Sequence, residues 1–255
     1  PKEFFAFLEQ FQLHHFLLSA LDCAYWDLFG KLENKSFSGI NQLENKTLAE
    51  SSITISIAEI DEQIRKIENS SWNKFKIKCN GFNLKNTEKL LNLNRNIALD
   101  ANASFTKEDC LFIQETPEFQ KLMYIEQPLE IGNFGILKNG NSVNWMADED
   151  CQDITFLEKL KPYYSSINIK LMKCGGLTPA LEMITEAKKL GYKIMLGCMT
   201  ESSIGISAGC AIAGLLDFAD LDGANLISND YATGSFVDNG KIILSEKPGL
   251  GIALL

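Results

Sequence analysis

The sequence predicts an α/β protein built as a (β/α)8-type barrel. Short β-rich runs alternate with helical patterns along almost the whole chain, and this alternation is typical of βαβ crossovers that form a parallel sheet. The residues that close successive strands recur every 22 to 27 residues, at Lys78, Asp100, Glu126, Asp148, Lys170, Gly197 and Asp222. Eight such units fit a barrel in a chain of 255 residues. A doubly wound open sheet is the alternative, but no Gly-rich phosphate loop follows the first strand.

The individual elements follow from hydrophobic periodicity. A first helix is predicted over residues 15–31, where an apolar stripe lies on a polar background. The predicted strands cover residues 53–57, 74–78, 97–99, 123–125, 143–147, 167–169, 193–196 and 218–219. The helical patterns between them cover residues 60–68, 85–93, 107–119, 134–138, 154–160, 179–190 and 202–216.

The same pattern predicts the domain organisation. We expect residues 1–50 to form a helical lead-in, residues 51–228 to form the barrel, and residues 229–255 to form a C-terminal segment. Pro1 is not a natural first residue, so we expect the numbering to begin inside a longer protein.

Composition narrows the classes of function. A net charge of −9 argues against nucleic acid or an anionic membrane as a partner, because phosphate binding needs a basic face. The two histidines, His14 and His15, are too few for a His-rich zinc site, so acid–base chemistry must rest mainly on other residue types. The seven cysteines form no C-x-x-C pair, which is typical of reduced thiols in a cytoplasmic protein. No apolar run is long enough to span a membrane.

Three acidic residues end three successive predicted strands. They are Asp100 in LDAN, Glu126 in YIEQP and Asp148 in WMADED. In a barrel the carboxyl ends of the strands converge on one face, where barrel enzymes carry out their chemistry. Carboxylate oxygens from adjacent strands suit a hard cation such as Mg²⁺. Each acid alone is more typical of an exposed loop, but three in register favour a magnesium site.

Two lysines flank these acids, Lys78 in KFKIKCN and Lys170 in INIKLMKCGG. Strand alternation puts Lys76 on the same side as Lys78. In a closed barrel the second and sixth strands face each other, so the two amines would face each other across the metal. A nearby cation and a like charge lower the pKa of an amine, which allows one lysine to act as a base. The alternative is a pair of surface lysines, and we expect Lys173 to be a surface residue.

The ends of the last two strands carry further candidates. The string ADLDG places Asp220 and Asp222 on one side of the last strand, and two close carboxylates are costly unless they meet a cation such as a substrate ammonium. An Asp-Gly turn or a helix N-cap is the alternative. At the end of the seventh strand, Gly197 allows the backbone to approach a ligand. Cys198 lacks an activating base and is not expected to be a nucleophile.

The order of these motifs resembles the enolase superfamily, in its muconate lactonizing enzyme-like branch, and is most similar to the dipeptide epimerases of the L-Ala-D/L-Glu type. The motifs KIK, DAN, EQP, DED, KLMK and DLD are specific as an ordered set, and the resemblance runs from about Leu18 to about Asp230. It implies a modified (β/α)7β barrel with a separate N-terminal α+β capping domain. The residues before the first strand look helical, so we expect that domain to be largely missing, with residues 229–255 packing against it.

The resemblance assigns a role to each group of residues. The implied ligands of one Mg²⁺ are Asp100, Glu126 and Asp148. The implied acid–base catalysts are Lys78 and Lys170. The residues implied to contact the substrate are Lys76, Cys198, Met199, Asp220 and Asp222, of which the two aspartates would hold the α-ammonium of a dipeptide. The residues expected to support the metal ligands are Asn102, Gln127 and Glu149.

The implied reaction inverts the α-carbon of the C-terminal residue of a dipeptide by proton transfer through an enediolate. One lysine would remove the α-proton and the other would deliver a proton to the opposite face. The alternatives are an o-succinylbenzoate synthase, an N-acylamino acid racemase or a cycloisomerase of the same branch, or a barrel that only binds a ligand. The dipeptide could be of the acidic Ala-Glu type or hydrophobic, and the sequence leaves a homo-oligomer open.

Overall fold

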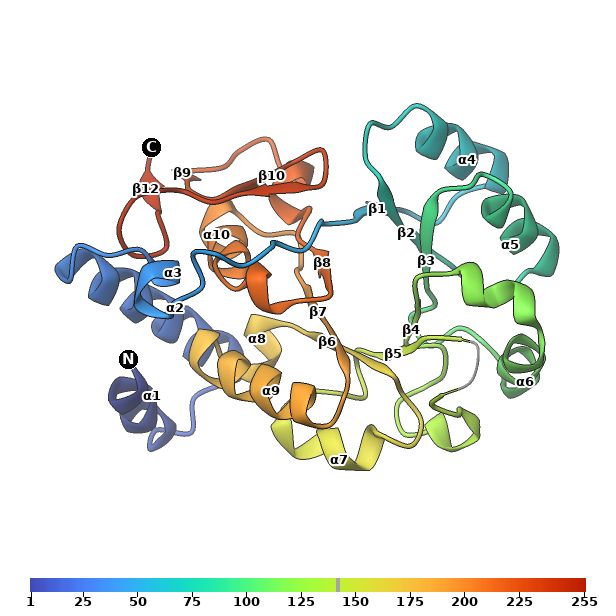
Figure 1. Ribbon diagram of the computed structural model, residues 1–255, viewed down its shortest axis with the longest axis horizontal. Coiled ribbons are helices and arrows are strands. Elements are labelled where there is room, and N and C mark those ends of the chain that lie inside the picture. Colours follow the sequence, from blue (N-terminus) through green and yellow to red (C-terminus); the bar gives the residue numbers. More distant parts are fainter. Residues whose placement is uncertain (141–142) are drawn as a thin grey trace.

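The computed structural model describes residues 1–140 and 143–255, and its centre is an eight-stranded parallel sheet (Figure 1). The strands are β1 (Ile53–Ile55), β2 (Lys74–Lys78), β3 (Asn96–Asp100), β4 (Ile125–Glu126), β5 (Trp145–Ala147), β6 (Ser166–Ile169), β7 (Lys193–Gly197) and β8 (Phe218–Asp220). Each pairs with the next in chain order. A parallel bridge between Ser51 and Ala219 joins the two ends of the sheet. The barrel prediction is confirmed, and the doubly wound alternative is wrong because that fold has a different strand order.

Helices surround the strands in Figure 1. The α-helices between strands are α4 (Ile60–Glu68), α5 (Leu84–Leu91), α6 (Lys107–Glu115), α7 (Leu157–Leu160), α8 (Leu171–Cys174), α9 (Leu177–Lys189) and α10 (Ser203–Ala211). Short 3-10 helices add to the connections at η1 (Pro117–Lys121), η2 (Phe134–Ile136), η3 (Ile154–Phe156), η4 (Ala213–Leu215) and η5 (Gly223–Leu226). After β8 the chain enters η5 and not an α-helix, as in the (β/α)7β pattern.

Several predicted elements have different bounds in the structure. The strand predicted over residues 123–125 is β4 (Ile125–Glu126), and the helix predicted over residues 134–138 is only the 3-10 helix η2. The helix predicted over residues 107–119 stops at Glu115, because Pro117 disfavours helical geometry in the residue before it and Thr116 is extended. The helix predicted over residues 202–216 ends at Ala211 and continues as η4. The strand predicted over residues 143–147 begins at Trp145.

The barrel interior is built in layers. A buried apolar cluster fills the barrel below the carboxyl ends of the strands and consists of Ala98, Tyr124, Met146 and Met195. Side chains alternate along a strand, so the residue two positions later on each strand also points inward. Those residues are Asp100, Glu126, Asp148 and Gly197. The apolar layer therefore forms a floor, and the polar residues at the carboxyl ends lie directly above it.

The N-terminal residues form α1 (Lys2–Glu9), α2 (His15–Leu32) and α3 (Phe37–Ile40), and α2 packs against α8 and α9. Its buried Asp22 accepts hydrogen bonds from the backbone N–H of Thr178 at 2.8 Å and from the Thr178 hydroxyl at 2.7 Å. Trp26 donates to the same hydroxyl at 2.9 Å. Gly176 leaves room for this contact, because a Cβ there would lie 2.5 Å from an Asp22 oxygen.

The C-terminal residues form two short antiparallel pairs, β9 (Ala232–Thr233) with β12 (Ala253–Leu254), and β10 (Phe236–Asp238) with β11 (Lys241–Ile243). They lie beside α10 in Figure 1. Leu250 links two helices, since its N–H donates to Asp27 of α2 at 2.9 Å and its carbonyl accepts from Ser207 of α10 at 2.7 Å.

The predicted domain boundaries remain predictions. Within the described ranges no helix has the length and apolar character needed to cross a bilayer.

The contact between α2 and α9 gives a test of the fold. We expect Asp22→Ala to lower the free energy of unfolding by about 2 kcal/mol, because two donors of Thr178 lose a buried partner. Urea denaturation monitored by circular dichroism measures this change. Asp61→Ala is the matched control, since Asp61 is exposed and its ion-pair partner among the described residues is the exposed Lys89. This control should change the free energy by less than about 1 kcal/mol. Equal effects of the two substitutions would contradict this account of α2.

Candidate active site at the carboxyl ends of the strands

Asp100, Glu126 and Asp148 lie together above the apolar floor of the barrel. Asp100 and Glu126 are register partners on β3 and β4, and Asp148 directly follows β5. The three residues are 2%, 0% and 1% exposed. The alternative that they are exposed loop acids is therefore wrong, because each belongs to the inward-facing set of its strand.

Lysines from opposite sides of the barrel reach these acids. Lys78 Nζ of β2 lies 2.9 Å from Asp100 Oδ2, and Lys170 Nζ, directly after β6, lies 2.8 Å from Asp148 Oδ2. Lys76 is buried and contacts two of the acids, with its Nζ 3.8 Å from Asp100 Oδ2 and 3.4 Å from Glu126 Oε2. In the strand order β2 and β6 are four places apart, so the ammonium groups of Lys78 and Lys170 approach the acids from opposite sides.

Lys173 also belongs to the site, so its prediction as a surface residue is wrong. Its Nζ lies 2.7 Å from Asp148 Oδ1, and its side chain is only 13% exposed. The reason is local, because the short helix α8 begins directly after Lys170. Residues three apart on a helix lie on the same side, so the single turn brings Lys173 back over Asp148.

The packing of these charges shifts their pKa values. Burial raises the pKa of Glu126 to about 8, and the neighbouring Asp100 and Asp148 add to the rise against the opposing effect of Lys76. Burial also acts to raise the pKa of Asp148, but Lys170 and Lys173 outweigh it and the pKa lies below its usual value. Burial acts to lower the pKa of Lys170, but Asp148 and Glu126 raise it above the usual value.

The donor set fits a hard cation. Carboxylate oxygens are the ligands that Mg²⁺ prefers, and Glu126 Oε2 has no hydrogen-bond partner among the described residues although it is fully buried. Its ion-pair contact with Lys76 Nζ, at 3.4 Å, is not a hydrogen bond, so this buried oxygen can still accept a cation. In the part of the chain that the structure describes, no three Asp, Glu, Cys or His side chains converge closely enough to hold a metal as they stand. A cation would therefore bind with a shift of these side chains.

Asp220 and Asp222 lie on the same side of the barrel mouth but have different partners. Asp220 is an ion-pair partner of Lys76 and accepts a hydrogen bond from the Ser52 hydroxyl at 3.0 Å. Asp222 Oδ2 accepts from the Thr54 N–H at 2.7 Å, whereas the hydrogen-bond contact of Oδ1 among the described residues is the long one with the Cys198 thiol at 4.0 Å. Burial and the charge of Asp220 raise the pKa of Asp222 to about 6. Asp222 precedes η5 without capping it, which disfavours the N-cap alternative.

The segment after β7 borders the same region. The half-buried Cys198 lies against Asp222, and burial together with the nearby aspartates raises the pKa of its thiol. A protonated thiol agrees with the expectation that Cys198 is not a nucleophile. Met199 is 43% exposed, and its N–H donates to Glu201 Oε1 at 2.8 Å.

The residues expected to support the metal ligands differ in their contacts. Gln127 is buried, and its Oε1 accepts from the N–H groups of Asp148 at 3.2 Å and Asp150 at 3.1 Å. Asn102 accepts a hydrogen bond from Lys78 Nζ at 2.9 Å. Glu149 has a buried Oε2 without a hydrogen-bond partner among the described residues. Gln127 thus fixes the backbone at Asp148, whereas Asn102 holds a lysine.

Sequence reasoning missed two buried polar residues. Asp150 accepts hydrogen bonds from Gln127 Nε2 at 2.9 Å and from the Tyr164 hydroxyl at 2.7 Å, which anchors the network below Asp148. Asn168 donates to Glu126 Oε1 at 2.6 Å. The signal for Asn168 was in the sequence, since it stands two residues before Lys170 and so shares its inward face.

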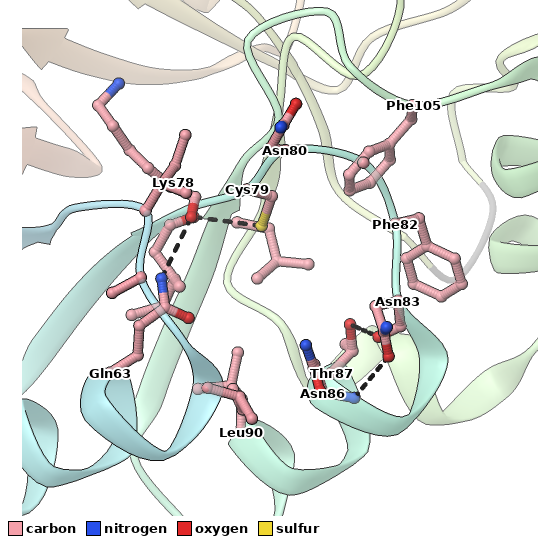
Figure 2. Close-up of a pocket in the computed structure, with 16 residues that line it drawn as sticks. Gln63, Lys78, Cys79, Asn80, Phe82, Asn83, Asn86, Thr87, Leu90 and Phe105 are labelled. Atoms are coloured by element: carbon pink, nitrogen blue, oxygen red, sulfur yellow. Dashed lines mark hydrogen bonds between the residues drawn. The ribbon is translucent and has the colours of Figure 1, made fainter.

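A separate cavity of about 200 Å³ lies beside β2 and away from the acids. Figure 2 shows that the Lys78 side chain points out of this cavity, whereas Leu90 and Thr87 of α5 line it. The Lys78 carbonyl faces Gln63 and accepts its amide hydrogen bond at 3.3 Å. The cavity therefore lies behind the strand and contributes none of its space to the acid–lysine cluster.

Comparison with known proteins identifies the family. The model of the enolase C-terminal domain-like family matches residues 59–255, which is more than half of the chain. The chain belongs to the enolase C-terminal domain-like family. The resemblance to the enolase superfamily that the motifs predicted is thereby confirmed.

Relatives of this chain include proteins named as epimerases. The L-Ala-D/L-amino acid epimerase of Maribacter sp. is 37% identical over 264 residues, which span all of this chain and 77% of the relative. The L-Ala-D/L-amino acid epimerase of Flavobacterium johnsoniae is 36% identical over 248 residues, which span 94% of this chain and 73% of the relative. The structure of the dipeptide epimerase from Methylococcus capsulatus, complexed with Mg and the dipeptide L-Arg-D-Lys, superposes with a TM-score of 0.80 at 27% identity. That superposition covers 92% of this chain and 72% of the other.

Proposed function

We propose that this chain carries the active site of a Mg²⁺-dependent dipeptide epimerase. The observation that carries the proposal is the approach of Lys78 and Lys170 to the acid cluster from strands on opposite sides of the barrel. Inversion at a carbon needs a proton carrier on each face, whereas dehydration or cycloisomerisation needs only one base. The names of the relatives from Maribacter and Flavobacterium support a dipeptide with an N-terminal L-Ala.

Asp100, Glu126 and Asp148 would hold the cation. Bound Mg²⁺ supplies Lewis-acid stabilisation of the negative charge that develops on the substrate carboxylate. Lys76 would add to this stabilisation, because its buried ammonium already lies between Asp100 and Glu126. The lysine that faces the α-hydrogen of the bound epimer removes that proton, and the lysine on the opposite side returns a proton to the other face.

The N-terminal ammonium of the dipeptide would bind at Asp222. Among the described residues its Oδ1 makes the weak thiol contact with Cys198, whereas both oxygens of Asp220 face partners, on Lys76 and Ser52. We therefore assign the direct ammonium contact to Asp222 and the placement of Lys76 to Asp220. This division favours a dipeptide over substrates of the same branch that lack a free ammonium at this place.

The free thiols are in keeping with a cytoplasmic enzyme. All seven cysteines are unpaired in the structure, as expected where thiols are kept reduced. We accordingly place the reaction in the cytoplasm, where the substrate would be a small peptide.

Hydrogen exchange tests the proposed reaction. We expect protein incubated with Mg²⁺ and a library of L,L-dipeptides in D2O to introduce deuterium at the α-carbon of the C-terminal residue. Mass spectrometry and proton NMR measure this incorporation, and the double variant Lys78→Ala/Lys170→Ala should abolish it because both proton carriers are removed. The dipeptides that exchange also decide between an acidic and a hydrophobic C-terminal residue. An absence of exchange across the library in protein that binds Mg²⁺ would support the ligand-binding alternative instead.

Substitution of each of the two aspartates should have a different kinetic effect. We expect Asp222→Asn to lower kcat/KM for the free dipeptide by about 10- to 100-fold, because a hydrogen bond to a charged group contributes about 1.5–3 kcal/mol. Activity on the N-acetylated dipeptide, which has no ammonium, should change far less.

Steady-state kinetics with both substrates makes this comparison. Asp220→Asn should instead lower the rate with both, since it removes a partner of Lys76. Asp61→Asn on the outer face of α4 is the control. Equal losses of Asp222→Asn on both substrates would refute the assignment of the ammonium.

A further inference from the structure

Asn168 lies in the barrel interior beside the proposed metal ligands. It is on β6, two residues before Lys170, and is 0% exposed. Its Nδ2 donates to Glu126 Oε1 at 2.6 Å. With Glu126 ionised, as it would be when it binds a cation, this short contact is a charge-assisted hydrogen bond, a class stronger than that between neutral groups.

The hydrogen bond leaves the two oxygens of Glu126 in different states. Oε1 is tied to Asn168, whereas Oε2 has no hydrogen-bond partner in the described ranges and lies 3.4 Å from Lys76 Nζ. A carboxylate held at one oxygen cannot rotate freely about its terminal bond. Oε2 is thereby kept directed toward Lys76, whose Nζ also lies 3.8 Å from Asp100 Oδ2.

The orientation of the Asn168 carboxamide follows from charge. Its Oδ1 is also buried without a hydrogen-bond partner among the described residues. Rotating the amide by half a turn would place Oδ1 against the Glu126 carboxylate and create repulsion between two acceptors. The Asn168 donor therefore faces Glu126, while its Oδ1 meets no donor among the described residues.

Gly197 of β7 provides the space for this arrangement. A Cβ at that position would lie 2.6 Å from Asn168 Oδ1 and 2.7 Å from Asn168 Nδ2. Both distances are well inside van der Waals contact, so any side chain at residue 197 would push the carboxamide away from Glu126. The glycine is needed here for close approach, since its φ is not in the left-handed region.

We propose that Asn168 is a positioning residue that orients Glu126 for Mg²⁺, and that Gly197 is required because it leaves room for the Asn168 carboxamide. This inference rests on the proposed function, which assigns Glu126 to the cation. Hydrogen-bond partners behind metal ligands contribute about 10- to 100-fold to metal affinity in other sites, and we expect an effect of that size here.

Calorimetric titration with Mg²⁺ alone tests the proposal without any measurement of activity. We expect Asn168→Ala and Gly197→Ala each to weaken Mg²⁺ binding by about tenfold or more. The two effects should not add, because in the Asn168→Ala background the new Cβ of Gly197→Ala no longer meets a carboxamide. The double variant should therefore bind Mg²⁺ within about twofold of Asn168→Ala alone.

Asn144→Ala is the matched control. Asn144 also donates a side-chain hydrogen bond between neighbouring strands, to the Met123 carbonyl at 2.8 Å, but it precedes β5 at the amino-terminal end of the strands. The Asn144→Ala variant should keep the wild-type affinity for Mg²⁺ even if its melting temperature falls. If Asn168→Ala does not fold, Asn168→Ser removes the same hydrogen bond with a smaller loss of volume.

Each outcome has a distinct meaning. Wild-type affinity in both Asn168→Ala and Gly197→Ala would overturn the positioning role. Additive losses in the double variant would overturn the link between the glycine and the carboxamide. A wild-type protein that binds no Mg²⁺ would instead overturn the proposed function itself. The wild-type titration is therefore carried out before any variant is compared.

Discussion

Buried negative charge at the mouth of the barrel is the constraint on which the rest of the site depends. Five carboxylates are at most 3% exposed, on Asp100, Glu126, Asp148, Asp220 and Asp222. A buried carboxylate without a partner destabilises the folded state by several kcal/mol. Four lysines meet this charge from β2 and from the start of α8, at Lys76, Lys78, Lys170 and Lys173. The same groups that balance the charge of the folded protein are thus those best placed to handle a proton or a carboxylate.

The barrel gives this cluster its geometry. Parallel strands end on one face, and the period of two along each strand places a polar residue directly above the apolar floor of Ala98, Tyr124, Met146 and Met195. The floor excludes water from below, which strengthens each electrostatic contact above it. On the outside, Asp22 of α2 holds the start of α9 through Thr178. The packing of α2 therefore supports the connection that follows Lys170.

Much of this arrangement could be predicted from the sequence, because strand spacing and alternation are local properties. They were sufficient to place Asp100, Glu126 and Asp148 on one face and Lys78 opposite Lys170. Other features depend on tertiary contacts. Lys173 returns to the site because α8 starts immediately after Lys170, and a single helical turn has too weak a pattern to be predicted. The different partners of Asp220 and Asp222 depend on Ser52 and Thr54, which come from the opposite end of the sheet.

The central claim is that two lysines act on opposite faces of one α-carbon, and single-lysine variants test it most directly. Lys78→Ala and Lys170→Ala would each be incubated in D2O with the separate L,L and L,D epimers of a substrate dipeptide, with deuterium followed by proton NMR. The account predicts that each variant exchanges the α-proton of one epimer only, that the two variants select opposite epimers, and that neither interconverts them. Interconversion by either variant, or exchange of the same epimer by both, would contradict the account.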